Sequence, residues 1–561
     1  MSRLRMTRAA LAAAVVVALA GCASIPMSGP VNEGDPLTPG EALGFDFRPQ
    51  GPDVGASQSE ILAGFLAAGA GPQDNYQVAR QFLTSTFAKE WDPGASVTVH
   101  GPATTALSDG QGGMRLMVPA VGRVDGRGRY EEYGKPLLVE LPFRMAKEDG
   151  EWRITQAPNG IVLSTGFFDR LFAERALYFY DAGFDYLVPD LRWFPSTAEA
   201  PTRVVEALLD GPSAPLASPV LVSAFPEGTN LERQSVTSLG GEAVVELNNE
   251  VVRADPITQQ RMQYQLERSL VGGSIISVRM SVDGSEVEVD PFGSAAPIVQ
   301  PLVNPRALAG RADQFGFLTA DEIAPIQGLS DTIVALKPTA AVYSDADQLT
   351  AVLTDGGVLA VRPGSPAVPI DDRGGLVAPS LDSQGFVWTV PGGDPSAIRA
   401  TAPGRDPAPV AAKGLTDATE ILSLAVSRDS ARLLTLLRTV DGVSLRVFGI
   451  GRDGTGRPLA LSDDWFDLVP PAGDPVTATW AADTTVASLG RDEDGGSSVT
   501  TQEVGGRVSD TLGELADAVA LVGGNGLSGL RALRSDGSVQ VLRGSGWQTV
   551  ATDVAFLAAQ R

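Results

Sequence analysis

The sequence predicts a multidomain protein in which two N-terminal α+β domains precede an all-β propeller of five or six blades. Helical periodicity and strand-like runs share the first half of the chain, whereas only short apolar runs separated by turn residues follow from about residue 315. One strand-turn-strand unit also recurs in that second half at roughly the spacing of propeller blades. The 561 residues suffice for about three or four domains of ordinary size.

Residues 1–21 have the features of a lipoprotein signal peptide. Three arginines within the first eight residues precede a short apolar run, and Leu19-Ala-Gly-Cys22 follows it directly. The run is too short to cross a bilayer, because a transmembrane helix needs about 20 apolar residues. We therefore expect cleavage before Cys22, a diacylglycerol on its thiol and a further acyl chain, such as palmitate, on the new amino terminus. The alternative is an ordinary secretory signal followed by a coincidental cysteine.

The charge of the chain limits its partners. The formal net charge is −24, and loss of the three signal-peptide arginines makes it −27. Such an acidic body is repelled by nucleic acid and by anionic lipid headgroups, which favours a protein or wall partner, although solubility alone explains the acidity equally well. Since Cys22 is the only cysteine, the mature chain can form no internal disulfide.

Residues 22–58 predict an extended tether, because this stretch is rich in Pro, Gly, Asp and Asn and has few large apolar residues. Residues 59–180 predict the first α+β domain. Two helical stretches open it, on either side of Gly71-Pro72. Strand-like runs follow at 97–100, 114–124, 137–144 and 151–155.

Residues 181–292 predict the second α+β domain. Its first strands belong to the aromatic run 177–194, and a short helix then ends at Asp210-Gly-Pro. Two more strands, at 243–247 and 275–282, enclose a helix, and Asp283-Gly284 predicts a hairpin turn. The Pro- and Ala-rich segment 293–314 predicts a linker.

Residues 315–561 predict the propeller. Five strand-turn-strand units can be aligned on one polar turn residue each, at successive spacings of 37, 47, 54 and 42 residues. These residues are Asp345, Asp382, Asp429, Asp483 and Asn525. The spacings bracket the ~40 to 50 residues of a four-stranded blade. Because the period is uneven, a pair of β-sandwiches is the alternative.

Motifs distributed over the whole chain resemble the LpqB lipoprotein family of actinobacteria. The motifs are Cys22-Ala-Ser-Ile-Pro-Met-Ser-Gly-Pro-Val behind the lipobox, Ile61-Leu-Ala-Gly-Phe-Leu-Ala-Ala and Ala79-Arg-Gln-Phe-Leu in the first domain, and Leu208-Leu-Asp-Gly-Pro-Ser in the second. The last motif, with Ala243-Val-Val-Glu-Leu and Val278-Arg-Met-Ser-Val-Asp-Gly, is similar to the GerMN domain, an extracytoplasmic binding module.

The resemblance implies a lipid-anchored protein on the extracytoplasmic side of the cell membrane. It implies an accessory role in the MtrA/MtrB two-component system, with the extracytoplasmic domain of an MtrB-like sensor histidine kinase as partner and an effect on wall metabolism and division. It assigns no catalytic, cofactor-binding or metal-binding residue, so Cys22 is the one site residue expected, as the point of lipidation.

A search for catalytic motifs supports a non-enzymatic function. His100 is the only histidine and is expected to be structural or solvated, and no Gly-x-Ser-x-Gly motif accompanies it. Zinc sites built from several Cys or His residues are impossible here. The glycine-rich segment Gly449–Gly454 lacks the Lys-Ser/Thr pair of a phosphate-binding loop and predicts a blade turn.

The carboxylates leave two alternatives open. We interpret the four repeated aspartates as turn-forming residues that bond to their own backbone. The segment Ser380-Leu-Asp382-Ser-Gln-Gly385-Phe-Val-Trp388 comes close to the Asp-box of sialidase propellers but is one residue too long. A propeller glycosidase acting on envelope glycan would instead need two carboxylates facing each other across ~5 to 10 Å. A purely structural envelope protein is the third possibility.

Overall fold

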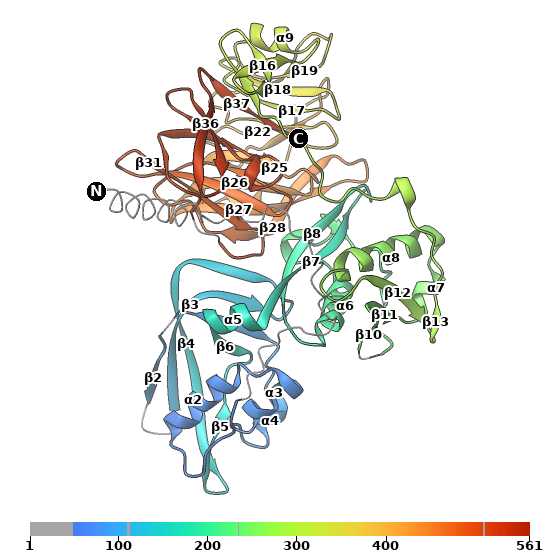
Figure 1. Cartoon of the computed structure of the whole chain (residues 1–561), viewed down its shortest axis with the longest axis vertical. Helices are drawn as coiled ribbons and strands as arrows, with labels where there is room; N and C mark the ends of the chain where they lie inside the picture. The colour runs from blue at the N-terminus through green and yellow to red at the C-terminus, as the bar shows by residue number, and fades with distance from the viewer. Residues whose placement is uncertain (1–48, 102, 109–112, 234, 509–510) are drawn as a thin grey trace, which may run out of the picture. The chain divides into compact units, whose positions relative to one another are not determined.

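The computed structural model describes residues 49–561 except 102, 109–112, 234 and 509–510 (Figure 1). The predicted signal peptide, Cys22 and the predicted tether up to residue 48 lie outside these residues. Within the described part of the chain, no helix is long and apolar enough to cross a membrane.

The first domain packs three helices on a six-stranded sheet, which confirms its α+β class. The helices are α2 (Gln58–Ala68), α3 (Gln73–Arg80) and α4 (Phe87–Glu90). The strands are β1 (Ser96–His100), β2 (Thr105–Ser108), β3 (Gly113–Asp125), β4 (Tyr130–Glu148), β5 (Glu151–Gln156) and β6 (Ile161–Ser164). The sheet order is β5-β4-β3-β1-β6, with β2 on the edge of β3 and only β1 and β6 parallel. A capping box between Ser57 and Glu60 starts α2, which turns Ile61, Leu62 and Phe65 into the core.

The second domain contains two small sheets and a long helix. After α5 (Thr165–Leu171), its elements are β7 (Phe172–Asp181), β8 (Leu187–Pro195), α6 (Ala200–Asp210), β9 (Leu221–Val222), β10 (Thr237–Leu239), β11 (Glu242–Glu246), α7 (Glu250–Arg253), α8 (Pro256–Leu270), β12 (Ser277–Val282) and β13 (Ser285–Glu286). The sheets have the orders β8-β7-β9 and β10-β11-β12-β13. The predicted hairpin is confirmed, since Asp283 and Gly284 both have positive φ between β12 and β13.

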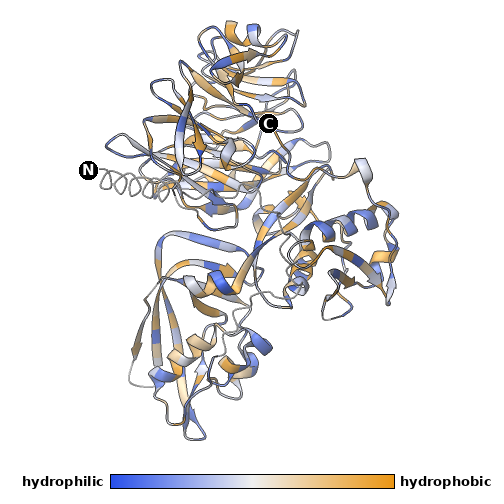
Figure 2. Ribbon diagram, in the orientation of Figure 1, coloured by the Kyte–Doolittle hydropathy of each residue, from blue (hydrophilic) through white to orange (hydrophobic). Residues whose placement is uncertain are grey.

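Helix α8 shows how this domain is covered. Asp255 caps it by accepting the backbone N–H groups of Ile257 and Thr258. Its buried residues include Met262 and Leu266, and it packs on β7 and β12. The side of α8 seen in Figure 2 is mostly blue to white, so this amphipathic helix places its polar face outward.

Six four-stranded antiparallel units follow, which confirms the propeller rather than the pair of sandwiches. The first unit contains β14 (Leu308–Gly310), β15 (Phe315–Thr319), β16 (Glu322–Pro325) and the last strand of the chain, β37 (Phe556–Gln560). The second contains β17 (Ala340–Ser344), β18 (Leu349–Thr354), β19 (Gly357–Val361) and β20 (Val368–Asp371), and the third contains β21 (Ser380–Leu381), β22 (Val387–Thr389), β23 (Arg399–Thr401) and β24 (Ala408–Pro409). The last three are β25 (Ala418–Val426), β26 (Arg432–Thr439), β27 (Gly442–Arg452), β28 (Pro458–Leu468); β29 (Asp474–Trp480), β30 (Thr485–Arg491), β31 (Gly496–Glu503), β32 (Leu515–Ala516); and β33 (Ala518–Val522), β34 (Arg531–Arg534), β35 (Val539–Arg543), β36 (Gly546–Ala551). One short helix, α9 (Ser330–Ala335), separates the first two units.

The last strand closes the propeller. Strand β37 pairs antiparallel with β14 and parallel with β17, so it completes the first blade with β14, β15 and β16. Strands β17, β21, β25, β29, β33 and β37 contact one another in sequence and return to β17. A ring of six inner strands is therefore closed, and β14 lies inside the segment 293–314 that the sequence predicted as a linker.

The aligned repeat residues mark the same place in five of the six blades. Each of the five aligned residues lies between the first and second strands of its blade, from Asp345 between β17 and β18 to Asn525 between β33 and β34. These turns meet at one end of the propeller, because successive inner strands occupy equivalent positions in the ring. We call this end the aspartate face.

Candidate functional site

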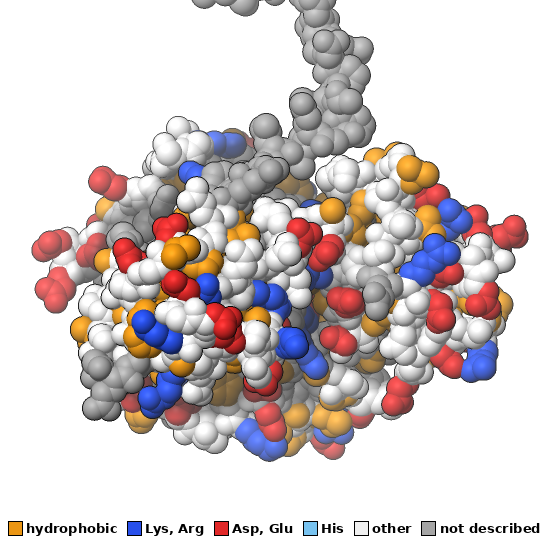
Figure 3. Space-filling view, turned by 90° about the horizontal axis from the view of Figure 1, so that it is seen from below, with side chains coloured by type: hydrophobic (Ala, Val, Ile, Leu, Met, Phe, Trp, Pro, Cys, Tyr) orange, Lys and Arg blue, Asp and Glu red, His pale blue; other side chains and the backbone are white. Residues whose placement is uncertain are grey.

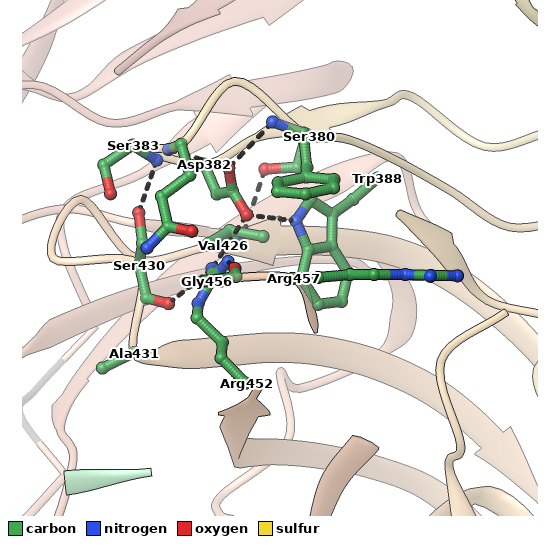
Figure 4. Close-up of polar contacts among 12 residues, drawn as sticks. Ser380, Asp382, Ser383, Trp388, Val426, Ser430, Ala431, Arg452, Gly456 and Arg457 are labelled. Atoms are coloured by element: carbon green, nitrogen blue, oxygen red, sulfur yellow. Dashed lines mark hydrogen bonds and ion pairs between the residues drawn. The ribbon is translucent and has the colours of Figure 1, made fainter. Parts of the chain in front are cut away.

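Asp382 anchors the most developed polar cluster of the aspartate face (Figure 4). Its carboxylate is fully buried, and one oxygen accepts the backbone N–H groups of Gln384 at 3.0 Å and Phe386 at 2.9 Å. The other oxygen accepts the Trp388 indole N–H at 3.1 Å and the Arg452 guanidinium at 2.8 Å. The predicted turn-forming role is confirmed for Asp382, whose four acceptor contacts leave little capacity for chemistry.

The cluster joins the third and fourth blades. Arg452 ends β27 of the fourth blade, so its ion pair with Asp382 crosses the blade boundary. The Val426 N–H donates to the Ser380 hydroxyl at 3.0 Å, and the Ser383 N–H donates to the Ser430 hydroxyl at 2.7 Å. These bonds satisfy backbone groups that would otherwise be buried without partners.

Asp429 and Asp483 flank the guanidinium of Arg432, which is 1% exposed. Asp429 pairs with this guanidinium and also accepts the Ala431 N–H at 2.9 Å. The same guanidinium nitrogen donates to the Asp483 backbone carbonyl at 2.8 Å and lies 3.5 Å from its carboxylate. The arrangement is carboxylate, guanidinium, carboxylate, and it joins the fourth and fifth blades.

Asp483 is the aspartate that most resembles a catalytic acid. Burial raises its pKa to about 6, although Arg432 opposes the shift. One of its carboxylate oxygens is buried and has no hydrogen-bond partner among the described residues. Its carboxylate nevertheless faces Arg432 rather than an opposed carboxylate, so the geometry differs from the pair that a glycosidase uses.

The remaining aligned residues also make structural contacts. Asp345 accepts the Tyr343 hydroxyl at 2.7 Å and the Gln348 amide at 3.1 Å. The Asn525 side-chain oxygen accepts the Val303 N–H at 3.0 Å and the Arg428 guanidinium at 3.2 Å. Arg428 therefore joins the fourth and sixth blades, an interaction that the sequence did not indicate.

The other sequence candidates carry no catalytic arrangement. His100 ends β1, and its imidazole contacts the carbonyl of the adjacent Gly101. Among the described residues, no group of three or more His, Cys, Asp or Glu side chains could hold a metal ion. The glycine-rich segment is partly strand rather than only turn, because Gly449 and Gly451 lie in β27. A Cβ on Gly449 would be 2.3 Å from the Pro215 carbonyl oxygen, so glycine allows the second domain to approach the propeller.

A carboxylate pair that sequence reasoning missed lies between the second domain and the propeller. Glu174 of β7 and Glu503 of β31 are neighbours, and burial together with the Glu503 charge raises the pKa of Glu174 to about 8. Glu503 also accepts the Thr484 hydroxyl at 3.1 Å. No local motif could reveal this pair, because the two residues come from different domains.

We expect Glu174→Gln to raise the melting temperature by a few degrees at pH 8 and to change it little at pH 5. The pKa of Glu174 is raised from 4.5, so between pH 4.5 and about 8 the folded protein retains a proton that the unfolded chain has lost. Stability therefore falls as the pH rises through this window, and the neutral amide removes the loss. Differential scanning calorimetry at both pH values tests this, with Glu493→Gln on an exposed turn as the control. Equal shifts at pH 5 and pH 8 would contradict the assignment.

Three family models match successive parts of the chain. Residues 51–169 match "Lipoprotein LpqB, N-terminal domain", residues 176–288 match "Sporulation and spore germination", and residues 313–556 match "Lipoprotein LpqB beta-propeller domain". The chain belongs to the LpqB lipoprotein family. Membership implies a membrane-anchored lipoprotein, and the names of the matched models do not describe an enzyme.

Curated relatives support the same assignment. "Lipoprotein LpqB" of Cutibacterium acnes is 32% identical over 53% of this chain and 52% of its own length. The protein of the same name from Thermobifida fusca is 28% identical over 70% of this chain and 64% of its own length, so the chain spans about half to two thirds of these relatives. Among solved structures, the tandem GerMN domains of the sporulation protein GerM from Bacillus subtilis are 20% identical over 34% of this chain and 59% of that chain, with a TM-score of 0.19. At that TM-score the likeness says nothing about function.

Proposed function

We propose that this LpqB-family protein is a binding protein held by a lipid on Cys22 at the extracytoplasmic side of the cell membrane. Its partner is the extracytoplasmic domain of an MtrB-like sensor kinase, and it modulates an MtrA/MtrB-type two-component system that affects wall metabolism and division. It needs no cofactor for this role.

The observation that carries the proposal is the use of the buried carboxylates on the aspartate face. Asp382, Asp429 and Asp483 contact arginines that cross blade boundaries, so they fix the propeller rather than meet a substrate. Two of the three family models and the curated relatives carry lipoprotein names, which is consistent with a non-catalytic role.

The second domain and the propeller share one hydrophobic core, so a contact made by one of them can affect the other. One hydrophobic cluster contains Leu177 and Met262 of the second domain together with Leu434 and Phe466 of the propeller. On the face seen in Figure 3, acidic and basic side chains are interspersed with small apolar patches. Protein–protein interfaces depend on a few buried contacts rather than on one reactive group.

We expect the isosteric variant Asp483→Asn to retain signalling within about twofold of wild type, because interface energy is spread over several contacts whereas catalysis depends on one or two groups. The variant is expressed in cells that lack the native protein, and phosphorylation of the response regulator is measured. Asp345→Asn serves as the matched control on the same face. Loss of signalling in Asp483→Asn alone, in protein that folds and reaches the membrane, would favour the glycosidase alternative.

Crosslinking in intact cells tests the partner directly. A photoreactive side chain introduced at exposed propeller positions is expected to capture the sensor kinase, whereas the same group at a buried position should not. If no exposed position captures the kinase in repeated experiments, the proposal is contradicted.

A further inference from the structure

Three large apolar side chains are exposed at one end of the β10-β11-β12-β13 sheet of the second domain. Leu239 ends β10 and is 86% exposed, Ile276 directly precedes β12 and is 74% exposed, and Val271 directly follows α8 and is 49% exposed. The two turns that carry these side chains are joined, because the Ile276 N–H donates to the Gly241 carbonyl at 2.8 Å. We call residues 237–241 and 271–276 the apolar tip.

Backbone hydrogen bonds fix both turns of the apolar tip. Leu239 is opposite Glu242 across a two-residue turn, whose two glycines both have positive φ. Gly272 and Ile275 exchange two N–H···O=C bonds, of 2.9 and 3.1 Å, and the buried side chain of Ile275 joins the hydrophobic core. Backbone groups that are already paired cost less to move into an apolar medium, so this tip can leave water at a lower cost than an irregular loop.

The apolar tip carries no charge, although the formal net charge of the protein is −24. Residues 235–241 and 269–278 contain no Asp, Glu, Lys or Arg. The first carboxylate behind the tip belongs to Glu242, which pairs with Arg279 at 3.2 Å, so its charge is offset. Because the acidic body is repelled by anionic headgroups, an uncharged tip is the place where approach to a membrane costs least.

A bilayer surface fits the apolar tip better than a protein partner does. A stable protein–protein interface buries about 800 Å² on each partner and is enriched in aromatic residues and Arg. The tip offers three exposed aliphatic side chains and contains no aromatic or charged residue. Membership of a lipoprotein family implies a membrane anchor, so a bilayer is always within reach, and this proximity makes a weak contact effective.

We propose that the apolar tip is a membrane-contact site, which inserts Leu239, Val271 and Ile276 into the boundary between headgroups and acyl chains. The contact is reversible, because three side chains bury little apolar area compared with an acyl chain. It holds the second domain with this end of its sheet on the bilayer. The site is additional to the binding function proposed above and does not depend on the kinase.

Cysteine labelling tests the proposal, because Cys22→Ser leaves a chain with no other cysteine. The mature chain of residues 22–561 carries this substitution and an N-terminal histidine tag in place of the lipid. It is bound to phosphatidylcholine vesicles that contain a small fraction of nickel-chelating lipid. A polarity-sensitive fluorophore on Ile276→Cys should shift its emission to the blue, brighten about twofold or more and be quenched by spin-labelled acyl chains. No response of this fluorophore to the vesicles would overturn the proposal.

Val440→Cys provides the matched control. Val440 is 74% exposed, as Ile276 is, but it lies in the turn between β26 and β27 of the propeller, beside Asp441. A fluorophore at this position is tethered to the same vesicles and should keep its emission in water. Equal responses at the two positions would show general adsorption of the body and would overturn the proposal.

A charge on the tip separates insertion from simple proximity. With the fluorophore on Leu239→Cys, the second substitution Ile276→Asp should reduce quenching by the spin-labelled lipid at least about fivefold, whereas Val440→Asp should change it less than about twofold. All three positions are exposed, so the variants should keep the melting temperature of the parent protein. Unchanged quenching in Ile276→Asp would overturn the proposal. Loss of kinase crosslinking in Ile276→Asp, with no response of the tip to vesicles, would overturn it in favour of a protein contact.

Discussion

Arg432→Ala is expected to lower the free energy of unfolding of the propeller by about 3–5 kcal/mol. Arg432 is almost completely buried between Asp429 and Asp483, and its guanidinium carbon also lies 4.9 Å from the centre of the Trp480 ring. Removal of one member of a buried charged cluster leaves the others uncompensated in a low-dielectric interior, which costs far more than loss of a surface pair. Urea denaturation of the purified body, followed by tryptophan fluorescence, measures the loss.

Arg438→Ala is the matched control for this prediction. Arg438 lies on the same strand, pairs with Glu420 and Asp474, and is 39% exposed, so its removal should cost no more than about 1 kcal/mol. A comparable loss in both variants would show that Arg432 contributes only as a surface residue does.

The effect of Arg432→Ala should grow as the pH rises from 5 to 8. The pKa of Asp483 is already raised to about 6 by burial, and loss of the arginine removes the charge that opposes this shift. A raised carboxyl pKa means that the folded state retains a proton lost by the unfolded state, so stability falls as the pH rises through the folded pKa. At pH 5 the protonated carboxyl is tolerated, and the difference from wild type is smallest.

Local sequence signals predicted the propeller, whereas its number of blades depends on pairing between the two ends of the propeller domain. The turn residues Asp345 to Asn525 mark five blades because each lies after an inner strand. The spacing is uneven because strand lengths differ, from two or three residues in β21 and β22 to eleven in β27 and β28. The remaining blade combines β14 with β37, and no local pattern predicts pairing across almost the whole domain.

The candidate sites, too, could be predicted from the sequence only where their contacts are local. Turn chemistry is local, so the role of Asp382 could be predicted from Ser380 to Trp388. Its partner Arg452 lies in another blade, and the Glu174–Glu503 pair joins two domains, so neither was visible in the sequence.

Cys22→Ser is expected to move the protein from the membrane fraction to the soluble fraction almost completely, with the folded body unchanged. Among the described residues, the buried core of the first domain begins at Ile61, and Ala56 packs against it, so we expect this core to form without the lipid. Two or more acyl chains hold a protein at a membrane, whereas the acidic body is repelled by anionic headgroups. Detergent-phase partitioning with metabolic palmitate labelling measures the change, and unaltered partitioning with equal label in the variant would contradict lipidation at Cys22.

The same variant should also abolish modulation of the response regulator at native expression levels. Confinement to one surface raises the effective concentration of a binding protein near a membrane-embedded kinase to about the millimolar range, and a released body is diluted far below it. Overexpression of the secreted Cys22→Ser body should then restore phosphorylation in part, because binding survives and only proximity is lost. Full signalling by the released body at native levels would contradict a membrane-embedded partner, and failure of any amount of it to restore signalling would indicate that the lipid itself takes part in the contact.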